Sequence, residues 1–208
     1  GRADGLAADV IQAALDKSPA LDKSLIEDIY LGCAEPSHRH GANMAKVVAT
    51  LLGLDGTPGA TINRFCASSA QTTRMAFHAI KAGEGDIFVS AGVECVSQYV
   101  NFAGAGGANE DDMNPKFLPA RERTRRTAET NETWHDPRED GELPDVYIAM
   151  GQTAENVAEL RGVDRQAQDE YAVRSQNRAE AAIASGFFAQ DITPVTLPDG
   201  TVVSADDS

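Results

Sequence analysis

The stretch from Asn63 to Gln71 constrains this chain more than any other. An apolar run, residues 59–62, leads into it, and a run with helical spacing, residues 73–81, follows it. This pattern predicts a strand, a tight turn and a helix, with Cys66 at the turn. Backbone N–H groups at a helix N-terminus favour negative charge, and the thiolate is the nucleophilic form of cysteine. Cys66 is therefore a candidate nucleophile, and its own N–H would supply half of an oxyanion hole.

The other reading of Cys66 is structural, because a lone cysteine is most often a small buried hydrophobic residue. The three cysteines, Cys33, Cys66 and Cys95, are far apart in the sequence and form no Cys-x-x-Cys pair. An odd number of separated cysteines suits a reducing compartment better than a disulfide framework. We expect Cys33, at the end of an apolar run over residues 28–33, to belong to the core.

The charge balance limits the partners of the chain. A net charge of −14 argues against nucleic acid or anionic membranes as partners of the general surface. An anionic substrate would need a local basic patch to offset this charge. There is no apolar run long enough to span a membrane and no signal peptide, so we expect a cytoplasmic protein.

Helical and apolar segments alternate along the first half of the chain. Helical patterns cover residues 4–17, the segment that follows Asn43, which is expected to cap that helix, and the segment after Cys66. Apolar runs cover residues 28–33, 59–62 and 86–92. This alternation predicts an α/β fold with a parallel sheet. Gly104-Ala105-Gly106 follows no strand and opens no helix, so we expect no nicotinamide cofactor.

Residues 101–145 differ from the preceding part of the chain in composition, which predicts a long insertion. They hold an acidic cluster at residues 110–112 and a basic run at residues 121–126. The basic run would suit cofactor phosphates or an acidic partner, but a solvated face interleaved with glutamate is the simpler reading. Two helices are expected after it, one from about Gly151 and a longer one capped by Asp164. Pro198-Asp199-Gly200 predicts a hairpin-like turn between two short apolar runs. No cysteine or carboxylate near His38 and His40 in the sequence completes a ligand set, so no metal is expected.

Four segments of the chain, taken together, resemble the thiolases. They occur in the family's order and span most of the chain, which makes the signal specific. The segments are Asn63-Arg64-x-Cys66-Ala67-Ser68, Ala91-Gly92-Val93-Glu94-Cys95-Val96-Ser97, Met150-Gly151-Gln152-Thr153-Ala154-Glu155-Asn156 and Asp169-Glu170-Tyr171-Ala172-Val173-Arg174-Ser175-Gln176.

The resemblance implies a thiolase-like layered α/β fold built from two similar halves, with a loop domain inserted in the first. Residues 1–98 then form the N-terminal core half, with its opening strand apparently missing, and residues 99–208 form part of the loop domain. The C-terminal half, which carries the family's second cysteine and its histidine, is absent. A homodimer or homotetramer is expected.

The resemblance also implies an acyltransferase of fatty-acid and lipid metabolism. Cys66 would carry the acyl group as a thioester, and Met150 would line the substrate pocket. Acyl-CoA and coenzyme A would be the substrates, and no cofactor would be bound permanently. Several positions depart from the common family pattern: Ser69, Ala70, Cys95, Val96 and Ala149. These departures bear on acyl-chain preference more than on the chemistry.

Two alternatives remain open at this point. A condensing enzyme of the ketoacyl-synthase kind also places a cysteine at a strand-to-helix turn on a related fold. The segment that begins at Met150 and the Asn-Arg pair before Cys66 favour a thiolase instead. A thiolase-like subunit that binds acyl-CoA without turnover is the non-catalytic alternative.

Overall fold

The computed structural model describes residues 2–37, 40–96, 111, 113–130 and 132–206. Two compact units are present. The first comprises Gly1–Tyr99 together with Phe188–Ser208, and the second comprises Val100–Phe187. The division into a core half over residues 1–98 and a loop domain over residues 99–208 stays a prediction.

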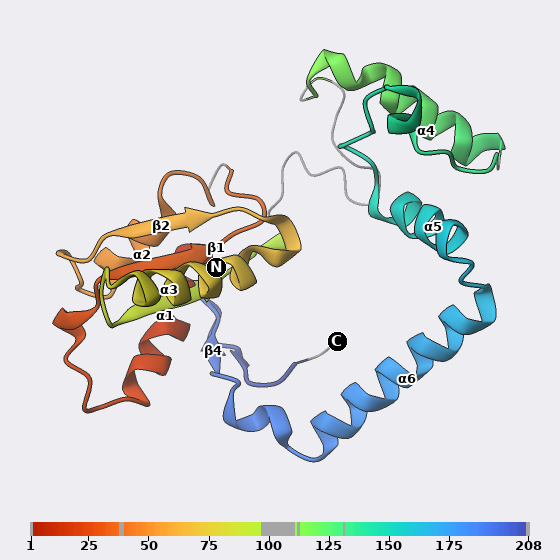
Figure 1. Ribbon diagram of the computed structural model, residues 1–208. Helices are drawn as coiled ribbons and strands as arrows, with labels where there is room; N and C mark the ends of the chain where they lie inside the picture. Colours follow the sequence, from red (N-terminus) through yellow and green to blue (C-terminus); the bar gives the residue numbers. More distant parts are fainter. Residues whose placement is uncertain (1, 38–39, 97–110, 112, 131, 207–208) are drawn as a thin grey trace. The chain divides into compact units, whose positions relative to one another are not determined.

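The first unit is built on a three-stranded parallel sheet (Figure 1). Its strands are β1 (Asp28–Gly32), β2 (Gly59–Ile62) and β3 (Phe88–Gly92), in the order β2-β1-β3. In the register, Leu31 of the central strand lies opposite Thr61 of β2 and Ala91 of β3. The predicted parallel α/β sheet is therefore confirmed.

One face of this sheet carries the hydrophobic core. Helices α1 (Ala3–Asp16) and α2 (Met44–Leu51) contact each other and this face. Ile29 and Leu31, two residues apart on β1, are both 0% exposed and belong to the core cluster. Alternate residues of a strand point to opposite faces, so the intervening side chain, Tyr30, points to the other face. It stacks there on Phe88 of β3, with ring centroids 5.8 Å apart.

Helix α3 (Ser68–Ala82) covers the second face of the sheet. Hydroxyl groups fix its first turns to β3, because Ser90 Oγ lies 3.0 Å from Thr72 Oγ1 and 2.9 Å from Thr73 Oγ1. Gly32 permits a close approach at the end of β1. A Cβ at Gly32 would lie 2.8 Å from the backbone carbon of Ser68 and 2.8 Å from the backbone nitrogen of Ser69. The N-terminus of α3 therefore rests directly on the carboxyl end of the central strand.

Asn43 occupies the N-cap position of α2 but does not cap the helix with its side chain. Its Nδ2 donates to the carbonyl of Gly59 at 2.6 Å, and its Oδ1 accepts a hydrogen bond from Thr61 Oγ1 at 3.1 Å. The expectation from sequence that Asn43 caps α2 is therefore wrong. The side chain instead ties the start of α2 to strand β2.

The second unit is helical. Its elements are two short 3₁₀ helices, η7 (Pro115–Phe117) and η8 (Pro137–Asp140), and three α-helices, α4 (Leu118–Thr130), α5 (Met150–Arg161) and α6 (Arg165–Ala184). The helices expected from Gly151 and Asp164 are confirmed. Asp164 caps α6 by accepting a hydrogen bond from the Ala167 N–H at 2.8 Å.

Helix α4 was not expected from the sequence, where its residues lie inside the predicted long insertion. The alternation of arginine and glutamate explains it, because opposite charges three and four residues apart stabilise a helix. Arg125 pairs with Glu122 and with Glu129, both at 2.6 Å. The segment Gly104-Ala105-Gly106 lies outside the described residues.

The end of the chain contains a small hairpin. After η9 (Phe187–Gln190), strands β4 (Val195–Thr196) and β5 (Val202–Val203) pair in antiparallel fashion around Pro198-Asp199-Gly200. This confirms the hairpin-like turn predicted from that tripeptide. A short 3₁₀ helix, η1 (Lys23–Leu25), precedes β1. In the part of the chain that the structure describes, none of the helices has the length and apolar character needed to cross a membrane.

Candidate active site

Cys66 lies in a short 3₁₀ helix, η3 (Phe65–Ala67), which joins strand β2 to helix α3. The strand, turn and helix predicted around this cysteine are therefore confirmed. Its side chain is exposed, unlike that of a typical structural cysteine. The turn lies where the chain leaves the carboxyl end of the parallel sheet, which is where ligands bind in open α/β folds.

The backbone immediately before Cys66 is in a conformation that residues other than glycine rarely adopt. Phe65 has φ +46°, in the left-handed region. Strain of this kind costs about 1–3 kcal/mol and persists only where surrounding contacts impose it. One such contact is made by Asn63, whose Oδ1 accepts a hydrogen bond from the Phe65 N–H at 2.8 Å.

Ser68 supplies the other contacts that hold the turn. Its Oγ accepts a hydrogen bond from the Arg64 N–H at 2.9 Å and donates one to the Phe65 carbonyl at 2.6 Å. The residue is only 5% exposed, so these bonds have little competition from water. Ser68 therefore closes a loop across the two residues that precede Cys66, and holds the cysteine outward.

The electrostatic setting of the turn favours an anion. Helix α3 begins at Ser68, two residues after Cys66, and runs for 15 residues. Its first N–H groups have no carbonyl partner inside the helix, and its dipole places partial positive charge at this end. The oxyanion formed when the Cys66 sulfur attacks a carbonyl would gain from both effects.

The other two cysteines have different surroundings. Cys33 is 1% exposed and belongs to the core, as the sequence predicted. Burial and a hydrogen bond to Glu94 raise the pKa of its thiol to about 12, so it stays protonated at neutral pH. Cys95 is partly buried against the core cluster. Cys66 is the exposed one among the three.

Met150, the predicted substrate-binding residue, is the first residue of α5 and is 68% exposed. It belongs to the second unit, and its role stays a prediction. The basic run predicted from sequence lies on α4, where its arginines have local partners. Arg123 pairs with Glu142 at 2.8 Å and donates to the Leu143 carbonyl, for example. This arrangement fits the solvated-face reading better than a phosphate site.

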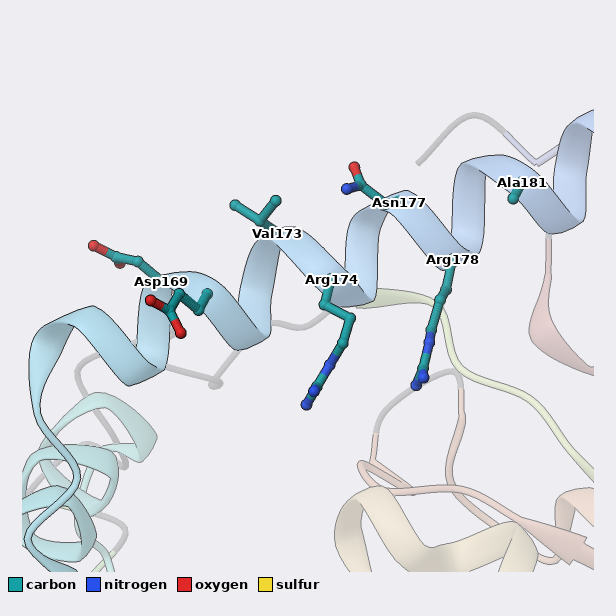
Figure 2. A pocket seen from close by; sticks show the side chains of 7 residues that line it. Asp169, Val173, Arg174, Asn177, Arg178 and Ala181 are labelled. Atoms are coloured by element: carbon teal, nitrogen blue, oxygen red, sulfur yellow. The ribbon is translucent and has the colours of Figure 1, made fainter.

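A surface hollow of about 570 Å³ lies along α6 (Figure 2). Its lining residues all come from this one helix, and none comes from the Cys66 turn. They are Asp169, Glu170, Val173, Arg174, Asn177, Arg178 and Ala181. A hollow with a single wall does not enclose a ligand, so we assign no site to it.

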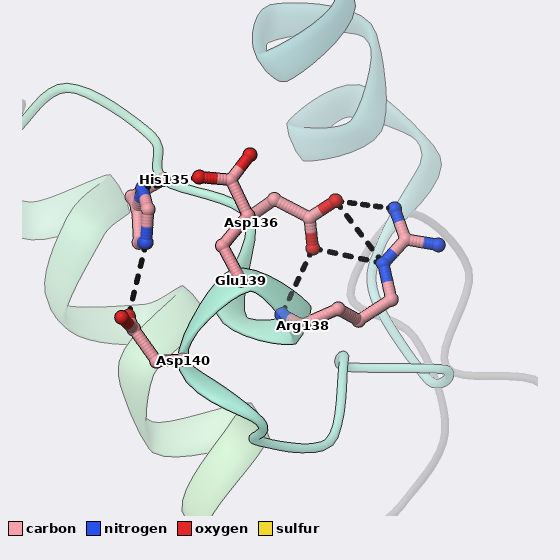
Figure 3. A network of polar contacts seen from close by, with 5 residues as sticks. All are labelled: His135, Asp136, Arg138, Glu139 and Asp140. Carbon is pink, nitrogen blue, oxygen red and sulfur yellow. Dashed lines mark hydrogen bonds and ion pairs between the residues drawn. The ribbon is translucent and has the colours of Figure 1, made fainter.

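Polar contacts local to η8 join His135 to Asp140 and Asp136 to Arg138 (Figure 3). His135 Nε2 lies 2.9 Å from Asp140 Oδ2, and the Asp136 carboxylate accepts hydrogen bonds from the backbone and side chain of Arg138. These bonds from Arg138 lower the pKa of Asp136 to about 2. The network therefore shapes a short exposed turn.

Replacing Ser68 by alanine tests whether this hydroxyl positions the nucleophile. The change leaves the Arg64 N–H without its partner and releases the Phe65 carbonyl, which should cost about 1–3 kcal/mol of stability. Because a misplacement of about 1 Å lowers reaction rates on the order of 100-fold, we expect the rate of Cys66 alkylation or acylation to fall by about 10–100-fold. Thr73→Ala removes an exposed hydroxyl of the same helix that does not bond to the turn, and should leave this rate within about twofold. Equal rates in Ser68→Ala and the parent protein would contradict the positioning role.

An exposed cysteine at a strained strand-to-helix turn, beside a helix N-terminus and above a parallel sheet, defines an α/β protein with a candidate cysteine nucleophile. The family model described as "Thiolase, N-terminal domain" matches residues 1–208. The chain therefore belongs to the thiolase family, and its fold is thiolase-like α/β.

Curated relatives agree with this family. The chain is 37% identical over 202 residues to the beta-ketoadipyl-CoA thiolase of Acinetobacter baylyi, covering 95% of this chain and 47% of the relative. It is 36% identical over 197 residues to the 3-oxoadipyl-CoA/3-oxo-5,6-dehydrosuberyl-CoA thiolase of Escherichia coli, covering 94% and 46% respectively. It is also 32% identical over 209 residues to the 3-ketoacyl-CoA thiolase of Pseudoalteromonas translucida, covering 99% and 46%. The chain thus spans about half the length of these relatives.

Proposed function

We propose that the full-length protein to which this chain belongs is a thiolase in activity, with Cys66 as the acylated nucleophile. The observation that carries the proposal is the placement of an exposed Cys66 on the strained turn before α3, inside the sequence Asn63-Arg64-Phe65-Cys66-Ala67-Ser68. Family membership supports the reaction class. The geometry supports the particular residue.

In the cleavage direction, the Cys66 thiolate attacks the 3-keto carbonyl of a 3-ketoacyl-CoA. The carbon–sulfur bond forms and the carbonyl oxygen becomes an oxyanion, next to the Cys66 N–H and the N-terminus of α3. When the carbonyl re-forms, the bond between C2 and C3 breaks. The electron pair of that bond leaves as the enolate of acetyl-CoA, which takes a proton to give acetyl-CoA, and Cys66 keeps the shortened acyl group as a thioester.

In the second step, the thiol of coenzyme A loses its proton and attacks the Cys66 thioester. This gives a shortened acyl-CoA and regenerates the Cys66 thiolate. Each step exchanges one acyl acceptor for another, so the sequence also runs as a condensation. The groups that move the protons are expected in the part of the full-length protein equivalent to the other half of the relatives.

The substrates proposed are acyl-CoA and coenzyme A, with no permanently bound cofactor taking part in the acyl transfer. The names of the relatives include both dicarboxylic (beta-ketoadipyl, 3-oxoadipyl) and general 3-ketoacyl substrates. A 3-ketoacyl-CoA is the class they share, and we propose that class for this protein. Met150 is proposed as a residue of the acyl-binding surface on the strength of the family resemblance.

We also propose a cytoplasmic homodimer or homotetramer. Helix α3 supports an assembled state, because its outer side carries Phe77, which is 55% exposed, and Ile80, which is 46% exposed. Apolar surface of this kind is commonly covered by another part of the protein or by a second copy.

The proposed function is tested by the CoA-dependent cleavage of 3-ketoacyl-CoA substrates by the full-length protein. Acetoacetyl-CoA and 3-oxoadipyl-CoA are the two substrates to compare, with acyl-CoA products identified by chromatography. Formation of acetyl-CoA from either substrate, dependent on added coenzyme A, supports the proposal. Failure to cleave either one, while an acyl-carrier-protein thioester is accepted, would instead favour the condensing-enzyme alternative.

A further inference from the structure

Three side chains of types that commonly bind metal ions in proteins lie close together beyond the ends of β1 and β3. Cys33 follows β1, Glu94 follows β3, and His40 lies in the connection between β1 and α2. One ligand atom from each lies within 4.8 Å of the others, and both Cys33 and His40 are buried. Sequence reasoning expected no ligand set around His40, because Cys33, although close in the sequence, was assigned to the core and Glu94 is distant along the chain. His38, the other histidine considered as a metal ligand from the sequence, lies outside the described residues.

The sheet brings Cys33 and Glu94 together. Parallel pairing continues past the strands, since the Val93 N–H donates to the Gly32 carbonyl at 3.0 Å. The Glu94 carboxylate then accepts hydrogen bonds from the backbone N–H of Ala34 at 2.6 Å and of Glu35 at 3.2 Å. These bonds fix the carboxylate in place, with Oε1 facing the sulfur of Cys33.

The Cys33 thiol donates to Glu94 Oε1, with the sulfur and oxygen 3.3 Å apart. This separation is close to that of two ligands on one metal ion. With a Zn–S bond of about 2.3 Å and a Zn–O bond of about 2.0–2.2 Å in tetrahedral geometry, the sulfur and oxygen lie about 3.5–3.7 Å apart. A Zn²⁺ ion could therefore replace the shared proton with little movement of either side chain.

We propose that Cys33, His40 and Glu94 form a binding site for a divalent metal ion of the zinc class. Binding forms bonds from the metal to the Cys33 sulfur, a His40 ring nitrogen and a Glu94 oxygen, and the thiol proton leaves to solvent. The thiolate and the carboxylate together neutralise the charge of the ion, and His40 remains neutral. Thiolate and imidazole ligands favour Zn²⁺ over Mg²⁺ or Ca²⁺.

The proposed metal would hold the segment between β1 and α2 against the sheet. His40 is anchored by its own backbone, because its N–H donates to the Ser37 carbonyl at 2.8 Å. A bond from its ring to a metal shared with Cys33 and Glu94 would connect that segment to the ends of two strands. None of the three proposed ligands takes part in the acyl transfer proposed for Cys66, so the metal site does not depend on the proposed function.

The test uses the full-length protein, freed of metal with a chelator and titrated with Co²⁺, whose bond to a thiolate gives a charge-transfer absorption in the near ultraviolet. We expect one Co²⁺ per chain with this absorption, displaced by one equivalent of Zn²⁺. His40→Gln keeps a polar side chain of similar size. It should weaken binding at least about 100-fold, because loss of a direct ligand should cost more than the roughly 10–100-fold typical of residues that only support the ligands. Cys66→Ala is the matched control and should bind as the parent does.

Three results would overturn the proposal. They are no charge-transfer absorption in the parent protein, an absorption unchanged in His40→Gln, and an absorption lost in Cys66→Ala. The last would place the metal at the exposed thiol. Thermal unfolding is the second measurement, and it also shows whether His40→Gln is folded. The unfolding temperature of the parent should rise on addition of Zn²⁺, and that of His40→Gln should not.

Discussion

Replacement of Cys66 by alanine in the full-length protein is expected to lower the rate of 3-ketoacyl-CoA cleavage by at least about 10³-fold, because the acyl-enzyme cannot form without the nucleophile. The fold should be unaffected. Cys66 is exposed, and substitutions at exposed positions usually change stability by no more than about 0.5 kcal/mol. The measurement is the steady-state rate, together with the thermal unfolding temperature of each variant.

Cys95→Ala is the matched control for this experiment. Cys95 is partly buried and lies in a segment that resembles a thiolase motif, yet no catalytic role is assigned to it. Its replacement should leave the cleavage rate within about tenfold of the parent, since it removes no group that contacts the substrate. A large rate loss in Cys95→Ala, with none in Cys66→Ala, would contradict the assignment of the nucleophile.

Replacement of Gly32 by alanine should damage both stability and activity. The new Cβ would lie 2.8 Å from backbone atoms of Ser68 and Ser69, which cannot rotate away as a side chain can. The start of α3 must therefore shift from the sheet, at a cost of about 1–3 kcal/mol. Because Cys66 is held through Ser68, we also expect its acylation rate to fall by about 10–100-fold. Thermal unfolding and the cleavage rate of the full-length variant check the two parts.

Gly5→Ala is the control, since it adds the same methyl group in a different setting. Gly5 lies inside helix α1, and a Cβ there would have nothing within 4 Å. Alanine in a helix interior is more favourable than glycine by about 0.5–1 kcal/mol, so this variant should be slightly more stable than the parent. A Gly32→Ala protein as stable as Gly5→Ala would show that the close contact between β1 and α3 is not required.

Local patterns were enough to predict the parts of the fold that depend on neighbouring residues. The apolar runs became the three parallel strands, and the position of Cys66 between a strand and a helix was correct. Asp164 capped the last long helix as expected. In each case the signal, whether periodicity or a capping residue, lies within a few positions of the element that it predicts.

The remaining features depend on contacts between distant parts of the chain. Glu94 and Cys33 are 61 residues apart, and only the pairing of β1 with β3 brings them together. Asn43 likewise stands where a side chain often caps a helix, but its side chain forms hydrogen bonds with β2 instead. Sequence reasoning also missed the contact of Ser68 with Arg64 and Phe65, although the serine stands inside the motif that identified the site.

The most direct test of Cys66 as the acylated nucleophile is intact and peptide mass spectrometry of the full-length protein after brief incubation with acetoacetyl-CoA without added coenzyme A. We expect one acetyl group per chain, on the peptide that contains Cys66, and no such adduct in Cys66→Ala. Cys33 serves as an internal control, because its thiol is buried with a pKa of about 12 and should stay unmodified. An acetyl group that persists in Cys66→Ala, or an active protein that acquires none at Cys66, would contradict the assignment.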